Sequence, residues 1–205
     1  MSPDPRHLLA EEELDKLERT LMQRVGARIR HIRLSRGWTQ QELAPYVGST
    51  QGGVAQTEAG GEVFTAATVT RYAVAFEIEP YELYLEPSDE PPKPPRRKAE
   101  LPQPIEPTAL SAHVNAFRGQ IGRRIYDLRT IQGMTLAFLA EFGAVDIAAL
   151  RRVEAGKGDF TLRSMVKVAE AIGVLPHELY LPRDQSSIRA KMPRASAARR
   201  NKSGS

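Results

Sequence analysis

The chain has 205 residues, of which 41% are hydrophobic and 6% aromatic, a profile typical of small helical units rather than of a β sandwich. It contains no cysteine, which excludes a disulfide framework and a thiolate metal site. It also lacks a run of about 18 apolar residues, so we expect no membrane-spanning segment and a soluble, cytoplasmic protein.

The net charge of +4 is concentrated at the end of the chain. Residues 1–21 carry −3 and residues 22–86 carry −1, whereas residues 111–182 carry +2 and residues 183–205 carry +6. A basic tail adds sequence-independent attraction to phosphate. A solvated, disordered end explains the same composition equally well.

The first segment, residues 1–20, reads as an acidic arm. Its leucines recur at roughly helical spacing, which predicts a short amphipathic helix that either ends near residue 20 or continues into the next helix. DNA would repel this acidic arm. We therefore expect it to pack on its own domain or on a protein partner.

A compact five-helix unit is expected over residues 21–86. Its first helix should run from Leu21 to Ser35, because apolar residues recur there at i, i+4, i+8 and i+11. A fourth helix should begin near Phe64, and Pro80 should open a last short helix, since proline favours the first helical position.

Between these helices, residues 38–62 predict two short helices joined by a tight turn. Thr39 and Glu42 have the spacing of a capping box, and Gly48 can end the helix in the left-handed conformation. Ser49 or Thr50 can cap the next helix. This pattern is typical of a helix-turn-helix, in which the second helix enters the DNA major groove.

Residues 87–110 form a proline-rich segment that we expect to be a flexible, extended linker. After it, the sequence repeats with a shift of 96 residues and no gap. Of the 61 positions from Gly26 to Glu86, 20 are identical in the second copy. The repeat predicts a second domain of the same fold over residues 111–182, followed by a basic tail over residues 183–205.

The chain resembles the Cro/CI-like (XRE-type) helix-turn-helix regulators of phages and bacteria. The matching residues are Gly26, Arg28, Ile29, Arg33, Gly37, Trp38, Thr39, Gln40, Leu43, Ala44, Thr50, Gln51, Glu58 and Gly60. The resemblance implies an all-α fold of two tandem five-helix, lambda-repressor-like domains. It also implies that Arg33–Glu58 and Arg129–Glu154 are structural ion pairs, each tying the first helix of a unit to the end of the third.

The resemblance implies the DNA-binding residues as well. Gln40 would bond the DNA backbone, and Gln51 and Gln56 would contact bases, since glutamine can bind adenine through its amide. The candidate DNA-binding set is Arg28, Gln40, Thr50, Gln51, Gly52, Gly53, Gln56, Arg151, Arg152 and Lys157.

Three features do not fit this interpretation well. Gly52 and Gly53 each cost a helix roughly 1 kcal/mol relative to alanine. Glu62 would be repelled by phosphate. In the second unit Leu136 replaces Gln40, and Ile147-Ala148-Ala149 replace Gln51-Gly52-Gly53. The second unit therefore favours dimerisation or partner docking, with DNA contact through its arginines as a close alternative.

Catalytic and metal-binding patterns are absent from the sequence. The four histidines have no metal or catalytic spacing, and Gly60-Gly61 lacks the Lys-Ser/Thr of a phosphate-binding loop. We expect no enzyme activity and no cofactor.

The leading hypothesis is a bacterial transcriptional regulator, a repressor rather than an activator, that binds double-stranded operator DNA as a homodimer in the cytoplasm and nucleoid. The alternative is a protein-interaction regulator, such as an antiactivator or an antitoxin-like partner, that uses the helix-turn-helix surfaces to bind a protein. An RNA-binding or coactivator-type adaptor is a third, weaker alternative.

Overall fold

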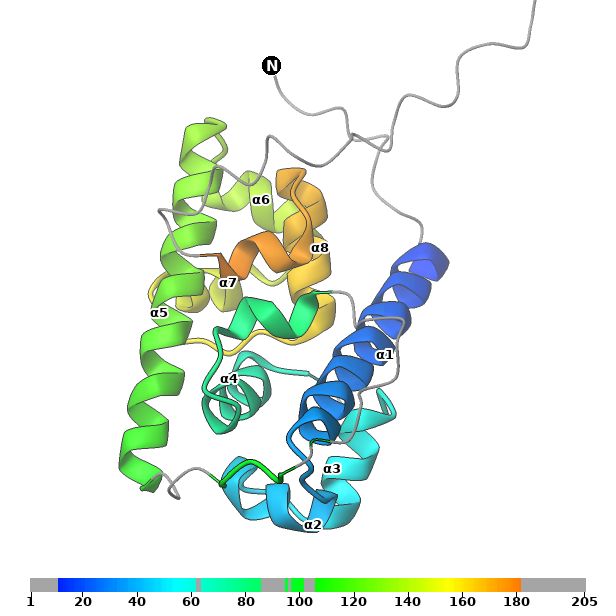
Figure 1. Ribbon diagram of the computed structural model, residues 1–205. Helices are drawn as coiled ribbons and strands as arrows, with labels where there is room; N and C mark the ends of the chain where they lie inside the picture. Colours follow the sequence, from blue (N-terminus) through cyan, green and yellow to red (C-terminus); the bar gives the residue numbers. More distant parts are fainter. Residues whose placement is uncertain (1–10, 62–63, 86–94, 96, 102–105, 182–205) are drawn as a thin grey trace, which may run out of the picture.

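The computed structural model describes residues 11–61, 64–85, 95, 97–101 and 106–181. Its regular secondary structure in these ranges is entirely helical. The predicted all-α class is confirmed for this part of the chain. Figure 1 shows two long helices, α1 and α5, that flank the shorter ones.

The first half contains four α-helices and two short 3-10 helices. They are α1 (Glu11–Ser35), α2 (Gln40–Leu43), η2 (Ala44–Val47), α3 (Gln51–Glu58), α4 (Ala66–Ala75) and η3 (Pro80–Tyr84). The predicted capping box is present, because the Glu42 amide donates to the Thr39 hydroxyl and the Glu42 carboxylate accepts from the Thr39 amide. Gly48 is left-handed, with φ 61°, as its position after the helix predicts.

The second half has the same order of elements, except that the single helix α6 (Leu136–Phe142) stands where the first half has α2 and η2. Its other elements are α5 (Pro107–Ile131), α7 (Ile147–Glu154), α8 (Leu162–Ile172) and η4 (Pro176–Tyr180). Helices α1 and α5 begin and end at positions that are 96 residues apart, and so do α3 and α7. Threonine caps α2, α3, α4, α6 and α8, and Asp146 caps α7 by accepting from the Ala149 amide.

Two expected boundaries can be compared with the observed helices. Of the two alternatives for the acidic arm, continuation into the next helix is observed from residue 11 onward, because α1 crosses residues 20 and 21 without a break. Leu17 and Leu21 both pack against the core, so the apolar face continues across that point. By contrast, α5 begins at Pro107, within the expected linker, and Val114 and Phe117 of its early turns are buried.

The two halves share one hydrophobic core and pack through contacts that repeat with exchanged partners. Helix α1 packs on α8, and its counterpart α5 packs on α4. The Ala66 amide donates to the Phe160 carbonyl at 3.3 Å, and the Leu162 amide donates to the Phe64 carbonyl at 2.8 Å. Such reciprocity is the property of a two-fold interface, here formed within one chain.

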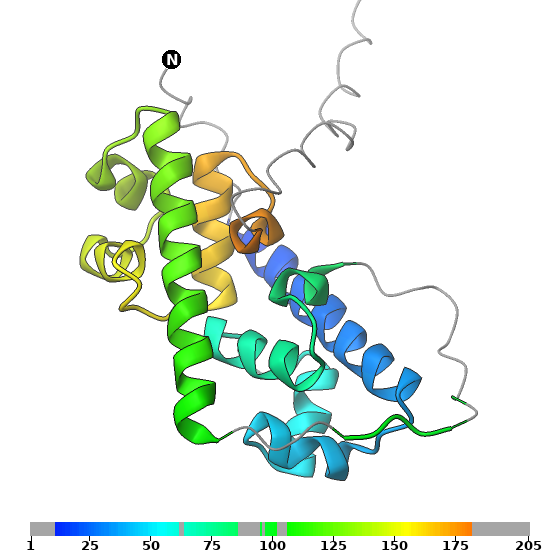
Figure 2. The same cartoon turned by 60° about the vertical axis from the view of Figure 1, so that its left-hand side comes forward.

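Equivalent residues meet each other where this approximate two-fold axis crosses the interface. Thr65 lies opposite Thr161 in an isolated antiparallel bridge. The rings of Tyr84 and Tyr180 stack with centroids 4.5 Å apart, and their hydroxyls are hydrogen-bonded. Figures 1 and 2 show α2 and α3 at the lower end of the molecule, α6 towards its upper end, and α7 beside the middle of α5.

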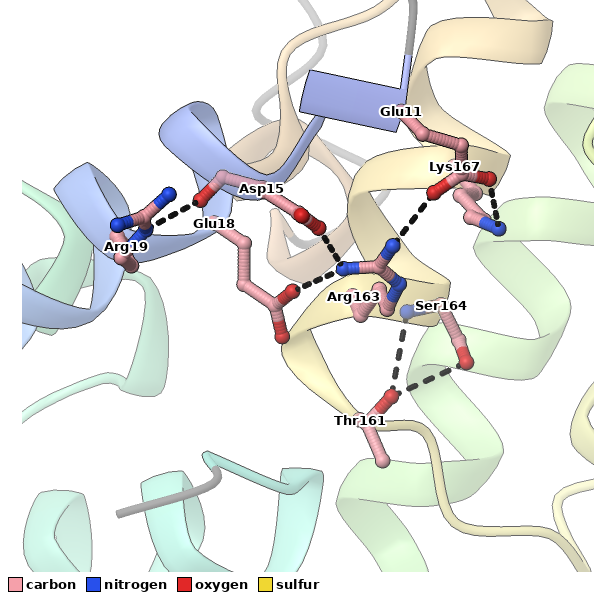
Figure 3. A network of polar contacts seen from close by, with 8 residues as sticks. All are labelled: Glu11, Asp15, Glu18, Arg19, Thr161, Arg163, Ser164 and Lys167. Atoms are coloured by element: carbon pink, nitrogen blue, oxygen red, sulfur yellow. Dashed lines mark hydrogen bonds and ion pairs between the residues drawn. The ribbon is translucent and has the colours of Figure 1, made fainter. Parts of the chain in front are cut away.

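The interface is not symmetric in charge. Arg163 on α8 bonds three carboxylates of the first turns of α1, namely Glu11, Asp15 and Glu18, as Figure 3 shows. Lys167 also reaches Glu11, with 3.3 Å between Nζ and Oε1. The hydrogen bond from Arg163 lowers the pKa of Asp15. The position equivalent to Arg163 in the first half is Ala67, so this network exists on one side of the interface only.

Candidate nucleic-acid interface

Helix α3 is held against α1 by a close backbone approach. A Cβ at Gly26 would lie 2.5 Å from the Thr57 carbonyl oxygen, so no side chain fits there. Gly122 has the same role against α7, where a Cβ would lie 2.1 Å from the Val153 carbonyl oxygen. Glycine at both positions lets the long helix fix the third helix of each half at van der Waals distance.

A buried ion pair completes the support of α3. Arg33 donates from Nη2 to Glu58 Oε2 at 2.9 Å and from Nη1 to the Trp38 carbonyl at 2.7 Å. In the second half Arg129 donates to Glu154 Oε2 at 3.0 Å and to the Met134 carbonyl at 2.7 Å. Each arginine therefore ties the end of its long helix both to the third helix and to the turn before the second helix.

The N-terminal turn of α3 is the exposed part of this helix. Gln51 and Gly52 are exposed, and Thr50 is engaged in capping, since its hydroxyl accepts from the Gly53 amide at 3.1 Å. Gln56, one turn later, is also exposed and donates to the Gly61 carbonyl at 3.2 Å. The outer surface of α3 thus presents amide side chains and glycine, without a charged group.

Two further residues expected on the DNA-binding surface also have partners within the protein. Gln40 is half-buried, and its amide donates to Glu58 Oε2 at 2.9 Å. Arg28 is half-buried and donates from Nε to the Glu82 carbonyl at 3.3 Å. Arg124 makes the same contact with the Glu178 carbonyl at 3.4 Å. The contact therefore belongs to the packing of the last short helix in both halves.

The corresponding surface of α7 is basic and partly apolar. Arg151, Arg152 and Lys157 are exposed, and Ile147 is 39% exposed. These residues occupy the positions of Ala55, Gln56, Gly61 and Gln51 in the first half. Three positive charges therefore stand on the second half where the first half has none.

Gly52 and Gly53 differ in how much space surrounds them. A Cβ at Gly52 would meet only the Thr50 hydroxyl, at 3.9 Å. A Cβ at Gly53 would lie 2.2 Å from the Ser49 hydroxyl, which would have to rotate away. Neither glycine has positive φ, so nothing in the fold of the free chain requires glycine at position 52.

The sequence did not reveal that part of the proline-rich segment docks on the first half. The Trp38 indole N–H donates to the Ala99 carbonyl at 2.9 Å, and the Ala99 amide donates to the Arg36 carbonyl at 3.0 Å. Lys98 pairs with Glu42 beside the start of α2. The bond from Lys98, with further hydrogen bonds from Thr39, holds the pKa of Glu42 at about 2.

We name residues 97–101 the strap. The only signal for it in the sequence is that the single tryptophan of the chain stands where the second half has Met134. The strap neutralises Glu42 with Lys98 and leaves Arg97 exposed. It thereby offsets an acidic group next to the helix-turn-helix of the first half.

Two features of the sequence interpretation lie outside the described ranges. They are Glu62 and the basic tail over residues 183–205. Within the described ranges, no group of three or more potential metal ligands lies together. Among the described helices, none combines the length and apolar composition needed to cross a bilayer.

Comparison with known proteins gives one match. Residues 29–83 match a family model described as helix-turn-helix. No curated protein and no solved structure matches the chain. The matched residues cover the last two turns of α1 and the elements from α2 to η3, which include the supported helix α3. The match supports a Cro/CI-like helix-turn-helix in the first half, and with it a DNA-binding transcription regulator in general.

Proposed function

We propose that the protein is a sequence-specific regulator of transcription that binds double-stranded operator DNA through α3, and that it represses rather than activates. The observation that carries this proposal is the exposed, uncharged surface of α3 with Gln51 and Gln56 upon it. An outward glutamine contributes nothing to the core, whereas its amide can bind adenine in the major groove.

The support of α3 favours the same proposal. Gly26 and the Arg33–Glu58 pair fix the helix against α1, so its exposed turn has a defined position before any ligand binds. A preorganised recognition helix loses less conformational entropy on binding than a mobile one. The fold thus supplies rigidity at the place where base recognition needs it.

The second half is part of this proposal as a tandem domain of the same kind. Support comes from the order of elements, which differs only where α6 replaces α2 and η2, from the equal spacing of the ion pairs and from the shared glycine contacts. We assign residues 11–85 to the first unit and residues 106–181 to the second. This function requires a protein that is located in the bacterial cytoplasm and associates with the nucleoid.

The roles of Gln40 and Arg28 in DNA binding are weaker parts of the proposal. Each has a hydrogen-bond partner within the protein, so a phosphate contact would have to replace or share that bond. Substitution of either residue should lower both stability and DNA affinity, whereas substitution of Gln51 should lower affinity alone.

Selection of bound sequences from a random duplex library, with the full chain at physiological salt, tests the function. An enriched motif is expected. The double variant Gln51→Ala/Gln56→Ala should bind the enriched duplex about 5- to 150-fold more weakly or worse, since a good bidentate contact contributes about 1–3 kcal/mol. Gln41→Ala is the matched control, because Gln41 is an exposed glutamine on α2 and not on α3. A change below twofold in the double variant would contradict base reading by α3.

One observation favours the second candidate function, a protein-binding regulator. Ile147 is exposed at the start of α7, next to the small side chain of Ala148. An apolar patch of this kind suits contact with a protein. If the library selection gave no motif and only weak, salt-sensitive binding, this function would replace the first.

A further inference from the structure

We infer that one chain acts as an internal dimer and binds a single operator composed of two unlike half-sites, one read by α3 and the other by α7. This inference rests on the proposed function, because it requires that the helix-turn-helix of the first half reads DNA. It goes beyond that function by assigning the form of the operator and the number of chains on it.

The first observation is the reciprocal interface between the halves. Helix α1 packs on α8 while α5 packs on α4, and Ala66–Phe160 and Leu162–Phe64 exchange backbone hydrogen bonds. A two-fold axis keeps related elements at the same level along itself. Helices α3 and α7 therefore stand at corresponding places on either side of the axis, as the halves of a symmetric dimer do.

The second observation is the short connection from each third helix to this axis. Seven peptide units join Glu154, the last residue of α7, to Thr161, which lies on the axis opposite Thr65. An extended chain of that length spans at most about 25 Å. The same count separates Glu58 from Thr65, and the two bridged threonines are themselves about 5 Å apart. The ends of α3 and α7 therefore lie at most about 55 Å apart, a range that contains the roughly 34 Å between half-sites one DNA turn apart.

The third observation concerns the ion pairs that favour the pairing of a first half with a second half. The carboxylates of Glu11, Asp15 and Glu18 face Arg163, as Figure 3 shows. Two first halves from different chains would present Ala67 to these carboxylates instead. Two second halves would present Pro107, Ser111 and Val114 to Arg163. Only the pairing of unlike halves brings the acidic and basic groups together.

The fourth observation is the difference between the two reading surfaces. At equivalent positions, α3 offers Gln51 and Gln56, whereas α7 offers Ile147 and Arg152. Glutamine suits adenine, arginine suits guanine, and an apolar side chain suits the methyl group of thymine. We therefore expect an adenine-containing half-site under α3 and a half-site with guanine and thymine under α7.

The charge difference gives the second half a further role. Arg151, Arg152 and Lys157 stand on the second unit, whereas the corresponding positions of the first are uncharged. Phosphate contacts at this surface should therefore come mainly from the second half. Each lost phosphate contact should lower the slope of log affinity against log salt by about 0.9.

The experiment combines library selection with the stoichiometry of the complex. The full chain should enrich a motif of two unlike half-sites, and native mass spectrometry should find one chain on that duplex. Arg151→Gln/Arg152→Gln should relax base preference in one half-site only, and Gln51→Ala/Gln56→Ala in the other only. Arg71→Gln is the matched control, because Arg71 is exposed on α4, at the position equivalent to Lys167, and belongs neither to α3 nor to α7.

A conversion variant sharpens the test. Ile147→Gln/Arg151→Ala/Arg152→Gln copies the reading residues of α3 onto α7, at three positions outside the core. The selected operator should then become a palindrome of the first half-site, still with one chain bound. Far-UV circular dichroism and urea unfolding should match those of the unaltered protein.

Three outcomes would overturn the inference. Two chains on a palindromic duplex would show that dimerisation between chains supplies the second reading helix. A motif with one half-site only, unchanged by the Arg151 and Arg152 substitutions, would show that α7 does not read bases. Both outcomes would leave base reading by α3 intact. No enriched motif at all would instead contradict the proposed function, and the inference with it.

Discussion

The two halves of the molecule share their internal contacts and differ in what they expose. Arg33 and Arg129 make the same three kinds of hydrogen bond, and Gly26 and Gly122 permit the same close approach of helices. By contrast, the positions of Gln51 and Gln56 in the first half are occupied by Ile147 and Arg152 in the second half. Packing therefore constrains the first group of positions, whereas the second group is exposed and is not constrained by packing.

A second difference lies in the environment of the turn before the second helix. In the first half Trp38 is buried, accepts a cation–π contact from Arg36 at 5.0 Å and bonds the strap. In the second half Met134 fills this place, and a Cβ at Gly133 would meet no atom of the described residues within 4 Å. Among the residues that the structure describes, an additional segment therefore covers this turn in the first half and not in the second.

Substitution of the arginines in the two buried ion pairs should change the free energy of unfolding most. Arg33→Met should lower the free energy of unfolding by about 3–5 kcal/mol, because it leaves the Glu58 carboxylate buried without its partner. Arg129→Met should cost less, since both side chains of the second pair are 11% exposed, against 7% and 4% in the first. Urea unfolding followed by circular dichroism measures both. The double variant Arg33→Met/Glu58→Met should recover most of the stability that Arg33→Met loses. Equal losses of stability in Arg33→Met and Arg129→Met would contradict the expected difference between the two ion pairs.

The strap should give the next largest effect. Trp38→Met copies the second half and should lower the free energy of unfolding by about 2–3 kcal/mol, a typical loss when a large buried side chain is shortened. It should also release the strap, so that trypsin cleaves faster after Arg97 and Lys98. Met134→Leu is the control and should leave the cleavage rate unchanged. Unaltered cleavage in Trp38→Met would mean that the indole does not hold the strap.

A smaller effect concerns the glycines of α3. Gly52→Ala should raise the free energy of unfolding by about 1 kcal/mol, because alanine is the better helix former and the site has space for a Cβ. The reciprocal change Ala148→Gly should cost about as much in the second half. Chemical denaturation measures both, and anisotropy of a labelled operator measures binding. A gain in stability with a loss of affinity would show that DNA approaches the backbone at position 52.

The smallest effect depends on pH. Burial lowers the pKa of His177, which stands where the first half has Tyr81. Below its ordinary pKa of 6.5 the unfolded chain binds a proton that the folded chain resists, so this contribution to stability is present above pH 6.5 and is lost as the pH falls. His177→Tyr should flatten the dependence of the unfolding midpoint between pH 7.5 and pH 5.5. An unchanged dependence would mean that other groups dominate this range.

Much of the fold follows from local sequence patterns. The capping box at Thr39, the helix end at Gly48 and the apolar stripe of the first helix each depend on neighbours within a few residues. The 96-residue repeat extends the same reasoning to the second half, since equal patterns favour equal elements. These features could be predicted because their energetics are decided within a turn or a helix.

The candidate site was only partly predictable for a related reason. That Gln51 and Gln56 are exposed follows from helical periodicity. That Arg28 bonds the Glu82 carbonyl, and Gln40 the Glu58 carboxylate, depends on residues 54 and 18 positions away. Helical periodicity does not predict contacts between residues so far apart in the sequence. Both side chains were therefore expected to be available for contact with DNA.

The helical class, the caps and ends of the helices, the 96-residue repeat and the residue types on each exposed surface can all be deduced from the amino-acid sequence. Three features emerge from the folded chain alone: α1 continues through the acidic arm to reach Arg163, the strap docks on Trp38, and the two halves join about an approximate two-fold axis. The difference lies in the range of the interactions. Helix formation and capping depend on local backbone bonds, whereas the interface depends on the fit of whole surfaces from distant parts of the chain.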